Sequence, residues 1–249
     1  GNRFGEAGSA VVIEEFMEGE EASLLAFVDG KAVVPMIASQ DHKRIFDGDK
    51  GPNTGGMGTY APAPVLTDAL RDEAMKTILE PMVAAMQKEG MPYVGCLYAG
   101  LMITPQGPKV VEFNARFGDP ETQVVLPLLD SDLGQIMMAS ATGTLTADMV
   151  KWKDSSAACV ILASKGYPET SSKGDVIHGD IKQHDTTIVF HSGTKLVGDE
   201  YVTNGGRVLG VVGLGKDLRT ALDRAYGRIE HIDFEGMQYR TDIGAKAFK

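Results

Sequence analysis

The sequence predicts an α+β fold, in which an antiparallel sheet with flanking helices is followed by a smaller, β-rich C-terminal domain. Apolar segments of strand length are joined by short turns, a pattern typical of antiparallel hairpins. Between them lie longer segments whose apolar residues recur at helical spacing. The chain changes texture at a polar join near residues 149–156, after which strands dominate, so we expect two domains, at 1–148 and 149–249.

Hairpins account for most of the first predicted domain. The two-residue turn Asp29-Gly30 is a strong hairpin signal, and Thr104–Pro108 is a second turn. The strands expected in this domain are Ser9–Phe16, Ala22–Val28, Ala32–Ile37, Val94–Ile103 and Lys109–Phe113. The stretch Ser39–Ala63 is polar, rich in glycine and without periodicity, so we expect a long loop there, of the kind that is functional or disordered.

Two helices complete the first predicted domain. The segment Thr67–Glu89 has apolar residues near one face, Thr67 as its capping residue, and Pro81 as a predicted kink. The second helix is expected to open at Asp119-Pro120, with a capping acid followed by proline, and to run to about Ala141.

The second predicted domain is mostly strands, with one helix. The helix, Asp217–His231, has apolar residues at a spacing of three to four. The strands expected around it are Ala157–Ala163, Thr187–Phe190 and Val208–Leu214, and the loops are Tyr167–Lys173 and Val197–Gly206.

The composition argues against several classes of protein. The chain has 249 residues and a formal net charge of −10, without a cluster of Lys and Arg, so we expect no nucleic-acid partner. No apolar run reaches membrane-spanning length and no signal peptide is visible, so we expect a cytoplasmic protein with no membrane partner. Because the chain starts at Gly1 and almost directly enters an apolar strand, we expect it to be a piece of a longer protein.

The polar pattern around residue 114 is the sharpest indication of chemistry. Side chains on a strand alternate in direction, so Glu112 and Asn114 share one face while Val111 and Phe113 are expected to point into a core. A carboxylate beside an amide oxygen suits a hard cation such as Mg²⁺ with its phosphate oxygens, and Arg116 is placed to reach a transferring phosphoryl group. From spacing alone, the solvated polar face of a half-exposed hairpin is the more frequent explanation.

An acidic stretch, Glu14–Glu21, follows the first expected strand. Its carboxylates repel one another, and composition alone favours an acidic surface turn. The functional alternative is a linker between two lobes whose backbone meets an adenine edge, with a carboxylate one turn later that accepts from ribose hydroxyls.

The glycine-rich stretch Gly51–Gly58 contains four glycines and allows a close backbone approach to a ligand. Its successive N–H groups are able to form an anion nest, although it matches neither a Walker A motif nor a Rossmann fingerprint. Asp41-His42-Lys43-Arg44, just upstream, puts three potentially basic groups beside it. The alternatives are a plain mobile loop and a solvated turn.

Other kinds of catalytic site are not supported. The sequence offers no Ser-His-Asp or Cys-His set, and the histidines are scattered without Cys-X-X-Cys, so a zinc site is not expected. The five histidines are His42, His178, His184, His191 and His231.

Several strings, taken in order along the chain, resemble the glycinamide ribonucleotide synthetase family of ATP-grasp ligases. The resemblance covers essentially the whole chain, although Glu-X-Asn-X-Arg alone would indicate only an ATP-grasp protein. The strings are Val12–Ser23 (VIEEFMEGEEAS), Ser39–Arg44 (SQDHKR), Gly51–Gly58 (GPNTGGMG), Tyr98–Met102 (YAGLM), Glu112–Thr122 (EFNARFGDPET), Gly174–Gly179 (GDVIHG), His191–Lys195 (HSGTK) and Val202–Leu209 (VTNGGRVL).

The resemblance implies an ATP-grasp fold and a C-terminal domain, here without the family's N-terminal Rossmann-like domain and most of its lid. It implies the reaction of ATP, glycine and 5-phosphoribosylamine to glycinamide ribonucleotide, ADP and phosphate through an acyl phosphate. The implied cofactors are ATP and Mg²⁺ or Mn²⁺. The implied partners are the two small substrates and the missing N-terminal domain, and a monomer is expected. We expect the chain to be inactive on its own.

The resemblance also implies roles for residues of this chain. Glu112 and Asn114 match the metal ligands, and Arg116 is the expected catalytic residue. The adenine hinge corresponds to Glu14, Glu15, Phe16 and Met17, and the ribose carboxylate to Glu21. The expected substrate-binding residues are Asp41, Lys43, Gly55, Gly56 and Asp119, with Lys195 or Arg207 in glycine-rich loops as contacts for the phosphate of 5-phosphoribosylamine.

Two other functions stay open at this point. One is a different ATP-grasp ligase, such as a carboxylase or a carbamoyl-phosphate enzyme, against which Gly55–Gly58 and His191–Lys195 argue. The other is a nucleotide-binding module without catalysis. A panel of substrates distinguishes the first, and binding of Mg·ADP without turnover would support the second.

Overall fold

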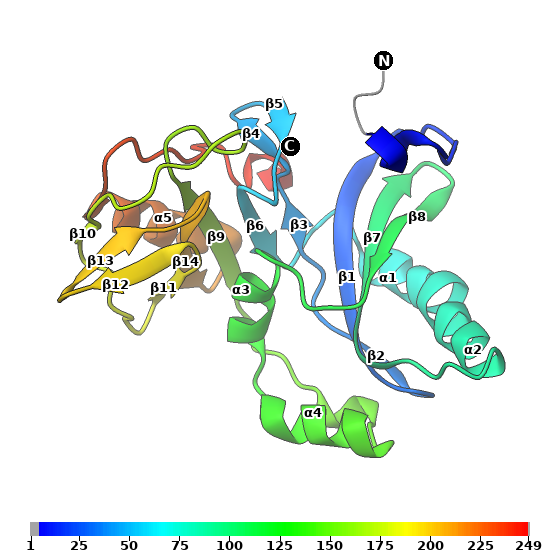
Figure 1. Ribbon diagram of the computed structural model, residues 1–249. Helices are drawn as coiled ribbons and strands as arrows, with labels where there is room; N and C mark the ends of the chain where they lie inside the picture. Colours follow the sequence, from blue (N-terminus) through cyan, green and yellow to red (C-terminus); the bar gives the residue numbers. More distant parts are fainter. Residues whose placement is uncertain (1–4, 249) are drawn as a thin grey trace.

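Two large antiparallel sheets form the framework of the computed structural model, which describes residues 5–248 (Figure 1). The first has the order β2-β1-β7-β8. Its strands are β1 (Glu20–Asp29), β2 (Val33–Pro35), β7 (Val94–Thr104) and β8 (Gly107–Asn114). The turns at Asp29-Gly30 and Thr104–Pro108 join β1 to β2 and β7 to β8, so both predicted hairpins are confirmed.

The second sheet has the order β11-β14-β9-β6-β3. Its strands are β3 (Gln40–Asp41), β6 (Gly58–Ala61), β9 (Ser156–Ala163), β11 (Thr187–His191) and β14 (Arg207–Gly215). The central strand β9 is buried along its whole length, as its unbroken apolar sequence leads one to expect. Because β6 pairs with β9, this sheet joins segments on both sides of the boundary proposed at 148/149, which stays a prediction.

Three small two-stranded sheets lie outside the two large sheets. They are β4 (Arg44–Phe46) with β5 (Lys50–Asn53), β12 (Thr194–Val197) with β13 (Glu200–Thr203), and β10 (His178–Gly179) with β15 (Ile232–Asp233). Short 3₁₀ turns lie at η1 (Gly5–Gly8), η3 (Leu126–Leu128), η4 (Ala147–Met149) and η5 (Ala245–Phe248).

Helices cover both outer faces and the space between the sheets (Figure 1). One face of the first sheet packs on α1 (Asp68–Ala74), the π-helical turn η2 (Met75–Leu79) and α2 (Glu80–Lys88). Its other face meets α3 (Thr122–Val125), α4 (Leu133–Thr142) and residues of β9 in a shared core. The far face of the second sheet is covered by α5 (Leu218–Ile229).

Local capping explains where the helices begin and end. The side chain of Thr67 accepts from Leu70 N at the start of α1, as predicted. Asp132 and Asp217 cap α4 and α5 in the same way, and α4 ends at Gly143 in the left-handed conformation. The expected disturbance at Pro81 is the π-helical turn η2, which ends two residues before the proline.

Three predicted elements were wrong. Ser9–Phe16 forms no strand, because β2 and β7 occupy both edges of β1 and the exposed Ile13 has no sheet to join. The stretch Ser39–Ala63 contains four short strands rather than one loop, because β9 offers β6 a pairing edge. The segment Asp119–Ala141 is broken into α3, η3 and α4, since Pro127 lacks a backbone donor and Asp132 caps a new helix.

The loop predicted at Val197–Gly206 is also corrected in part. Its first half belongs to the β12–β13 hairpin, in which Val197 pairs with Glu200. By contrast, Tyr167–Lys173 contains no strand or helix, as expected.

The contact of α5 with β14 yields the first prediction. A Cβ on Gly213 would lie 2.6 Å from Ala225 N and nearer still to Ala221 O, so Gly213→Ala should force α5 off the sheet. We expect a loss of about 1–3 kcal/mol in the free energy of unfolding, measured by urea denaturation.

The matched control for this prediction lies on the same helix. Gly227 is exposed within α5, and a Cβ added there would meet no atom within 4 Å, so Gly227→Ala should stabilise the chain by about 0.5–1 kcal/mol. Equal effects of the two substitutions would contradict the close packing of α5 on β14.

Candidate functional site

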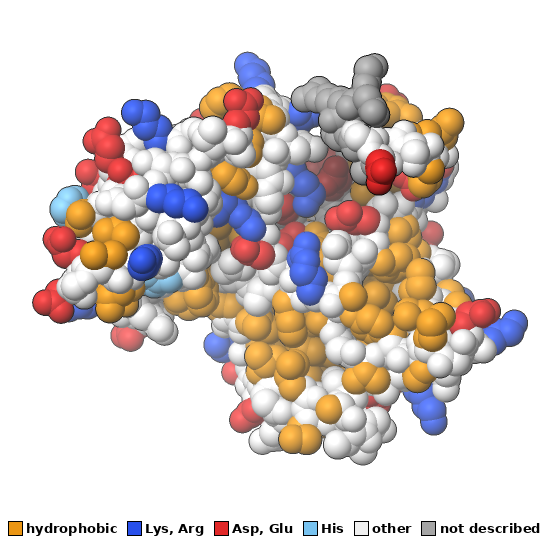
Figure 2. All heavy atoms as spheres, viewed as in Figure 1, with side chains coloured by type: hydrophobic (Ala, Val, Ile, Leu, Met, Phe, Trp, Pro, Cys, Tyr) orange, Lys and Arg blue, Asp and Glu red, His pale blue; other side chains and the backbone are white. Residues whose placement is uncertain are grey.

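A polar pocket beside the first sheet collects residues from four segments of the chain. It is lined by Glu21 of β1, Asp41 of β3 with the following Lys43, Tyr98 of β7 and Glu112 of β8. A cleft of about 290 Å³ continues from it between β1 and the β4–β5 hairpin, where Arg44, Asn53 and Lys246 join the lining. Figure 2 shows acidic and basic side chains gathered in the hollow between the two halves of the molecule.

Glu112 and Asn114 lie side by side on the face of β8 that meets the pocket. Glu112 Oε1 accepts a hydrogen bond from Asn114 Nδ2 at 3.1 Å. Their partners on β7 are Gly100 and Tyr98. A Cβ on Gly100 would be 3.3 Å from Glu112 Cγ, so the glycine leaves room for the carboxylate side chain.

A β-bulge produces this arrangement and corrects one expectation. The register of β7 and β8 shifts between Gly100 and Leu101, which pair with Glu112 and Val110. Val111 is therefore the extra residue and is 40% exposed, rather than pointing into the core as predicted. Phe113 does pack against the core between the first sheet and α1–α2.

Asp41 and Lys43 form an ion pair at the pocket. Lys43 Nζ lies 3.2 Å from Asp41 Oδ2, and the Asp41 side chain is only 4% exposed. Burial and then the nearby carboxylate of Glu121 raise the pKa of Asp41 to about 7, although Lys43 lowers it. Burial disfavours the charged form of Lys43, but Asp41 and Glu121 outweigh it and raise the pKa of the ammonium.

The sequence suggested that His42 is one of three basic groups beside the glycine-rich stretch, but the structure shows that it carries no charge. It is 1% exposed, its Nδ1 lies 3.1 Å from Gly58 O, and its Nε2 accepts from Gly244 N at 3.3 Å. Burial and then the charge of Arg240 lower the pKa of His42 to about 4, so the ring is neutral. Two cations, Lys43 and Arg44, remain of the three expected beside the glycine-rich stretch.

The N–H groups of residues 54–57 are not available for the anion nest expected within Gly51–Gly58, because they already donate within the protein. The four hydrogen bonds run from Thr54 N to Lys43 O (2.7 Å), from Gly55 N to Tyr167 Oη (3.0 Å), from Gly56 N to Thr54 Oγ1 (3.0 Å) and from Met57 N to His42 O (2.8 Å). A glycine is nevertheless required at position 56, because the backbone there passes close to the Asp41 carboxylate and a Cβ would lie 2.8 Å from Asp41 Oδ1.

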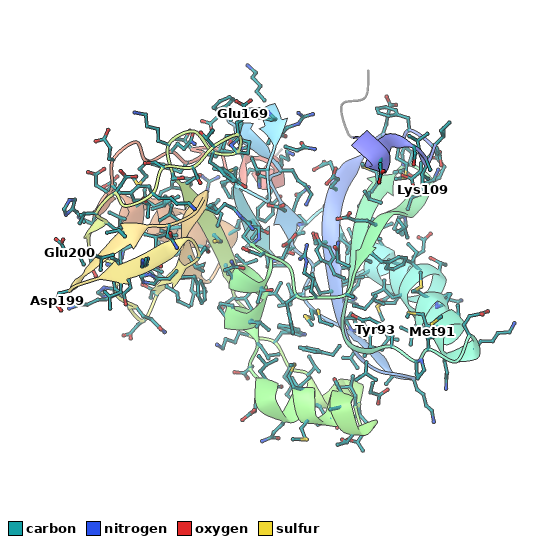
Figure 3. The ribbon with its side chains drawn as sticks, viewed as in Figure 1. Met91, Tyr93, Lys109, Glu169, Asp199 and Glu200 are labelled. Carbon is teal, nitrogen blue, oxygen red and sulfur yellow. The ribbon has the colours of Figure 1, made fainter. Side chains whose placement is uncertain are left out.

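The two predicted phosphate contacts lie on different elements, Arg207 at the start of β14 and Lys195 on the separate β12–β13 hairpin. Arg207 is 20% exposed and donates to Gly55 O at 2.8 Å, Asp119 O at 2.9 Å and Asp119 Oδ2 at 2.8 Å. Lys195 is exposed on β12, in the hairpin whose tip is marked by Asp199 and Glu200 at the far edge of Figure 3. The structure brings Arg207, but not Lys195, to the glycine-rich stretch.

The predicted adenine hinge lies next to the cleft but outside it. Glu15, Phe16 and Met17 line a separate hollow beside the β7–β8 turn, and it shares Gly19 and Glu20 with the cleft. Lys109, labelled in Figure 3 on β8, forms an ion pair of 2.7 Å with Glu15. The remaining predicted residues, Glu14 and Arg116, are exposed and line neither pocket nor cleft, and Arg116 Nη1 donates to Phe117 O at 3.0 Å.

A buried polar network beneath the pocket was missed by the sequence analysis. Tyr98 Oη donates to Glu121 Oε1 at 2.7 Å, and Ser23 Oγ lies 2.8 Å from Tyr98 Oη. All three side chains are 5% exposed or less. The available signal was a polar residue inside an otherwise apolar strand, at Ser23 and at Tyr98. No such signal marks Lys246, which lines the cleft, or Tyr167, which bonds to Gly55, because the fold alone brings them there.

Within residues 5–248, no three or more His, Cys, Asp or Glu side chains come together in a way that could hold a metal ion. A metal at Glu112 and Asn114 would therefore take most of its ligands from elsewhere. That fits Mg²⁺, which keeps several waters and uses substrate phosphates as ligands. Over the same range, no helix has the length and apolar character needed to cross a membrane.

Comparison with known proteins identifies the family. A model of the phosphoribosylglycinamide synthetase ATP-grasp (A) domain matches residues 1–122, and a model of the C domain matches residues 157–246. The chain belongs to the phosphoribosylglycinamide synthetase family. The resemblance seen in the sequence motifs is thereby confirmed.

Relatives of the synthetase family match the whole chain. It is 55% identical to phosphoribosylamine–glycine ligase of Caulobacter vibrioides, covering 100% of this chain and 59% of the relative. It is 52% identical to the trifunctional purine biosynthetic protein adenosine-3 of Gallus gallus, covering 98% of this chain and 24% of that protein. The chain thus spans about three fifths of the single-function relatives it matches.

Solved structures confirm the ATP-grasp fold of this synthetase family member. The crystal structure of phosphoribosylamine–glycine ligase from Thermotoga maritima superposes with a TM-score of 0.82 at 35% identity, over 93% of this chain and 57% of that one. The biotin carboxylase domain of Hydrogenobacter thermophilus 2-oxoglutarate carboxylase, solved with MgADP, ADP and bicarbonate, gives a TM-score of 0.63 at 14% identity, over 88% of this chain and 47% of that one. The second likeness concerns the fold alone.

The buried Asp41 yields a prediction about pH. Its ordinary pKa is 3.8 and its pKa in the fold is about 7, so between these values the folded state holds a proton that the unfolded state has lost. The contribution of Asp41 to stability therefore falls as the pH rises through this range. Asp41→Asn removes the charge, so the stability of the variant relative to wild type should rise by on the order of 4 kcal/mol between about pH 4 and pH 8.

The measurement is urea denaturation across this pH range. Asp223→Asn, at an exposed position of α5, is the matched control and should keep a constant difference from wild type. A difference between Asp41→Asn and wild type that does not change with pH would contradict the raised pKa.

Proposed function

We propose that the protein is an ATP-dependent ligase that joins glycine to 5-phosphoribosylamine, giving glycinamide ribonucleotide, ADP and phosphate. The observation that supports it most is the convergence of Glu21, Asp41, Lys43 and Glu112 on one pocket, although they come from separate segments of the chain. The name phosphoribosylamine–glycine ligase is carried by relatives at about half identity, for example 55% for the Caulobacter vibrioides protein.

For the nucleotide, we propose that the segment before β1 and the start of β1 bind ATP. Glu15, Phe16 and Met17 line a hollow that adjoins the cleft, where an adenine edge would meet backbone groups near Glu14. Glu21 lines both the pocket and the cleft, which suits a carboxylate that accepts from ribose hydroxyls.

For the metal, we propose that Glu112 and Asn114 hold Mg²⁺ or Mn²⁺ together with the phosphates of ATP. The ion would supply charge neutralisation at the transferring phosphoryl group. Glu112 contributes a carboxylate that Gly100 leaves unobstructed, and Asn114 contributes an amide on the same strand face. Two protein groups suffice because the remaining ligands of such an ion are water and phosphate oxygens.

The proposed reaction has two steps. The glycine carboxylate attacks the γ-phosphorus of ATP, the bond to the β-phosphate oxygen breaks, and ADP leaves. The amine of 5-phosphoribosylamine then attacks the carbonyl carbon of the glycyl phosphate, phosphate leaves, and the amine loses a proton. Positioning and charge neutralisation dominate such phosphoryl transfers, so no protein nucleophile is needed.

Cations of this chain stabilise the developing charge in the proposal. Lys43, held charged by Asp41 and Glu121, faces the pocket beside Glu112. Arg116 follows Asn114 at the end of β8, is exposed, and is the proposed catalytic arginine for the phosphoryl group. The proposal also includes Gly55, Gly56 and Asp119 as substrate-binding residues. Gly56 lies next to the pocket residue Asp41, since a Cβ there would be 2.8 Å from Asp41 Oδ1.

Further parts of the proposal concern the second substrate and the setting. We assign the phosphate of 5-phosphoribosylamine to Lys195, whose ammonium is exposed on the β12–β13 hairpin. We propose a cytoplasmic monomer that acts on small molecules, in keeping with the net charge of −10 and with the enzymes of purine synthesis among its relatives.

The central experiment measures phosphate release by the full-length gene product at saturating Mg·ATP, glycine and 5-phosphoribosylamine. Glu112→Gln keeps the size of the side chain but removes its charge, so we expect turnover to fall about 100-fold or more. Glu80→Gln, at an exposed position of α2, is the matched control and should keep normal turnover. Circular dichroism checks that Glu112→Gln is folded. Near-normal turnover of the folded variant would contradict the proposed metal site and show that this strand face is only a solvated polar face.

The ribose assignment has its own test. Glu21→Ala should raise the KM for ATP about tenfold, because a hydrogen bond to a charged group contributes about 1.5 kcal/mol or more. Glu169→Ala, on the exposed loop labelled in Figure 3, should leave the KM unchanged. An unchanged KM in Glu21→Ala removes Glu21 from nucleotide binding.

A further inference from the structure

The guanidinium of Arg207 connects two distant segments at the edge of the site. Nη1 donates to Gly55 O at 2.8 Å and to Asp119 O at 2.9 Å, while Nη2 forms an ion pair of 2.8 Å with Asp119 Oδ2. These partners are 152 and 88 residues away in the sequence. The side chain is 20% exposed, so its N–H groups donate mainly to protein acceptors rather than to solvent.

Tyr167 holds the other side of the same peptide segment. Its hydroxyl accepts from Gly55 N at 3.0 Å, so the N–H and the C=O of Gly55 both bond to residues beyond position 160. The ring of Tyr167 packs against the small core of Ile45, Met57 and Ala163. It also covers Gly206, where a Cβ would lie 2.7 Å from Cε2 and nearer still to Cδ2 of the ring.

Residues 54–57, which Arg207 and Tyr167 hold at Gly55 and which we call the clamped segment, are hydrogen-bonded to the backbone beside the polar pocket. Thr54 N donates to Lys43 O at 2.7 Å, and Met57 N donates to His42 O at 2.8 Å. Gly56 packs so closely that a Cβ would lie 2.8 Å from Asp41 Oδ1. A displacement of Gly55 would therefore move the backbone that carries the Asp41–Lys43 pair.

We propose that Arg207 and Tyr167 are positioning residues, through which the second sheet sets the place of the glycine-rich segment and of Lys43. This inference rests on the proposed ligase function, because Lys43 is there the cation beside the reacting phosphoryl group. It replaces the hypothesis that Arg207 itself binds the phosphate of 5-phosphoribosylamine. Arg207 acts on the chemistry through Gly55 and Asp119 and does not touch substrate.

Substitutions distinguish the positioning role of Arg207 from a role in binding the phosphate of 5-phosphoribosylamine. Arg207→Lys keeps the positive charge but cannot reach three acceptors with one ammonium, and Tyr167→Phe removes only the hydroxyl that receives Gly55 N. Arg219→Lys and Tyr201→Phe are the matched controls. Arg219 lies over the ring of Phe248, and Tyr201 is on the β12–β13 hairpin.

The first measurement is hydrogen exchange at residues 54–57 in the 249-residue chain, which needs no activity. Tyr167→Phe and Arg207→Lys should speed exchange in this segment about tenfold or more, while both controls leave it as in wild type. Melting temperatures show that each variant is folded. Unchanged exchange in both clamp variants overturns the proposal.

The second measurement is the kinetics of phosphate release by the full-length gene product. We expect kcat to fall about 10- to 100-fold in Arg207→Lys, with the KM values for ATP and 5-phosphoribosylamine within about threefold of wild type. Normal kcat despite faster exchange overturns the positioning role. A raised KM for 5-phosphoribosylamine with normal exchange assigns Arg207 to the substrate instead, and also overturns it.

The two measurements also keep this inference distinct from the function on which it rests. If the wild-type enzyme releases no phosphate with glycine and 5-phosphoribosylamine, the proposed ligase function fails together with the positioning role. The exchange measurement still decides whether Arg207 and Tyr167 hold Gly55.

Discussion

The pairing of β6 with β9 is the contact on which the rest of the site depends. Gly58 to Ala61 form a ladder with Ala157 to Val160, and Gly58 fits only because it lacks a Cβ, which would lie 2.7 Å from Cys159 O. This ladder fixes residues 41–57, which precede β6, at the edge of the second sheet and beside the cleft that borders β1. The ion pair of Asp41 and Lys43, the hairpin β4–β5 and the glycine-rich segment all owe their positions to it.

The polar groups between the sheets explain why so much charge is tolerated near a core. Glu121 and Asp41 are buried, and each isolated carboxylate would be costly there without partners. Glu121 accepts from Tyr98 and Ser23, and Asp41 accepts from Lys43 and from His42 N. Asp41 and Glu121 in turn raise the pKa of Lys43, which keeps its ammonium charged.

The bulge at Val111 shows how a local irregularity sets the strand face that carries Glu112 and Asn114. With strict alternation, Val111 would have packed into the core, and the prediction assumed this. The extra residue shifts the register, so that Gly100 stands opposite Glu112 and Tyr98 opposite Asn114. Gly100 leaves space for the carboxylate, while Tyr98, on the same strand β7, joins the buried network through its hydrogen bond to Glu121. Bulges of this kind are common beside active sites because they re-aim a side chain.

The sequence by itself determined the elements whose cause is local. Hairpins at Asp29-Gly30 and Thr104–Pro108, the cap at Thr67, and the side-by-side placement of Glu112 and Asn114 follow from turn chemistry and from the two-residue period of a strand. Ser9–Phe16 has strand propensity but no partner, which only the occupied edges of β1 could reveal. The tertiary structure alone decided that His42 is neutral, that Arg207 holds Gly55, and that Tyr167 and Lys246 reach the site. The physical reason is that burial and long-range hydrogen bonds depend on which segments meet, and the pairing of β6 with β9 decides that for segments far apart in the chain.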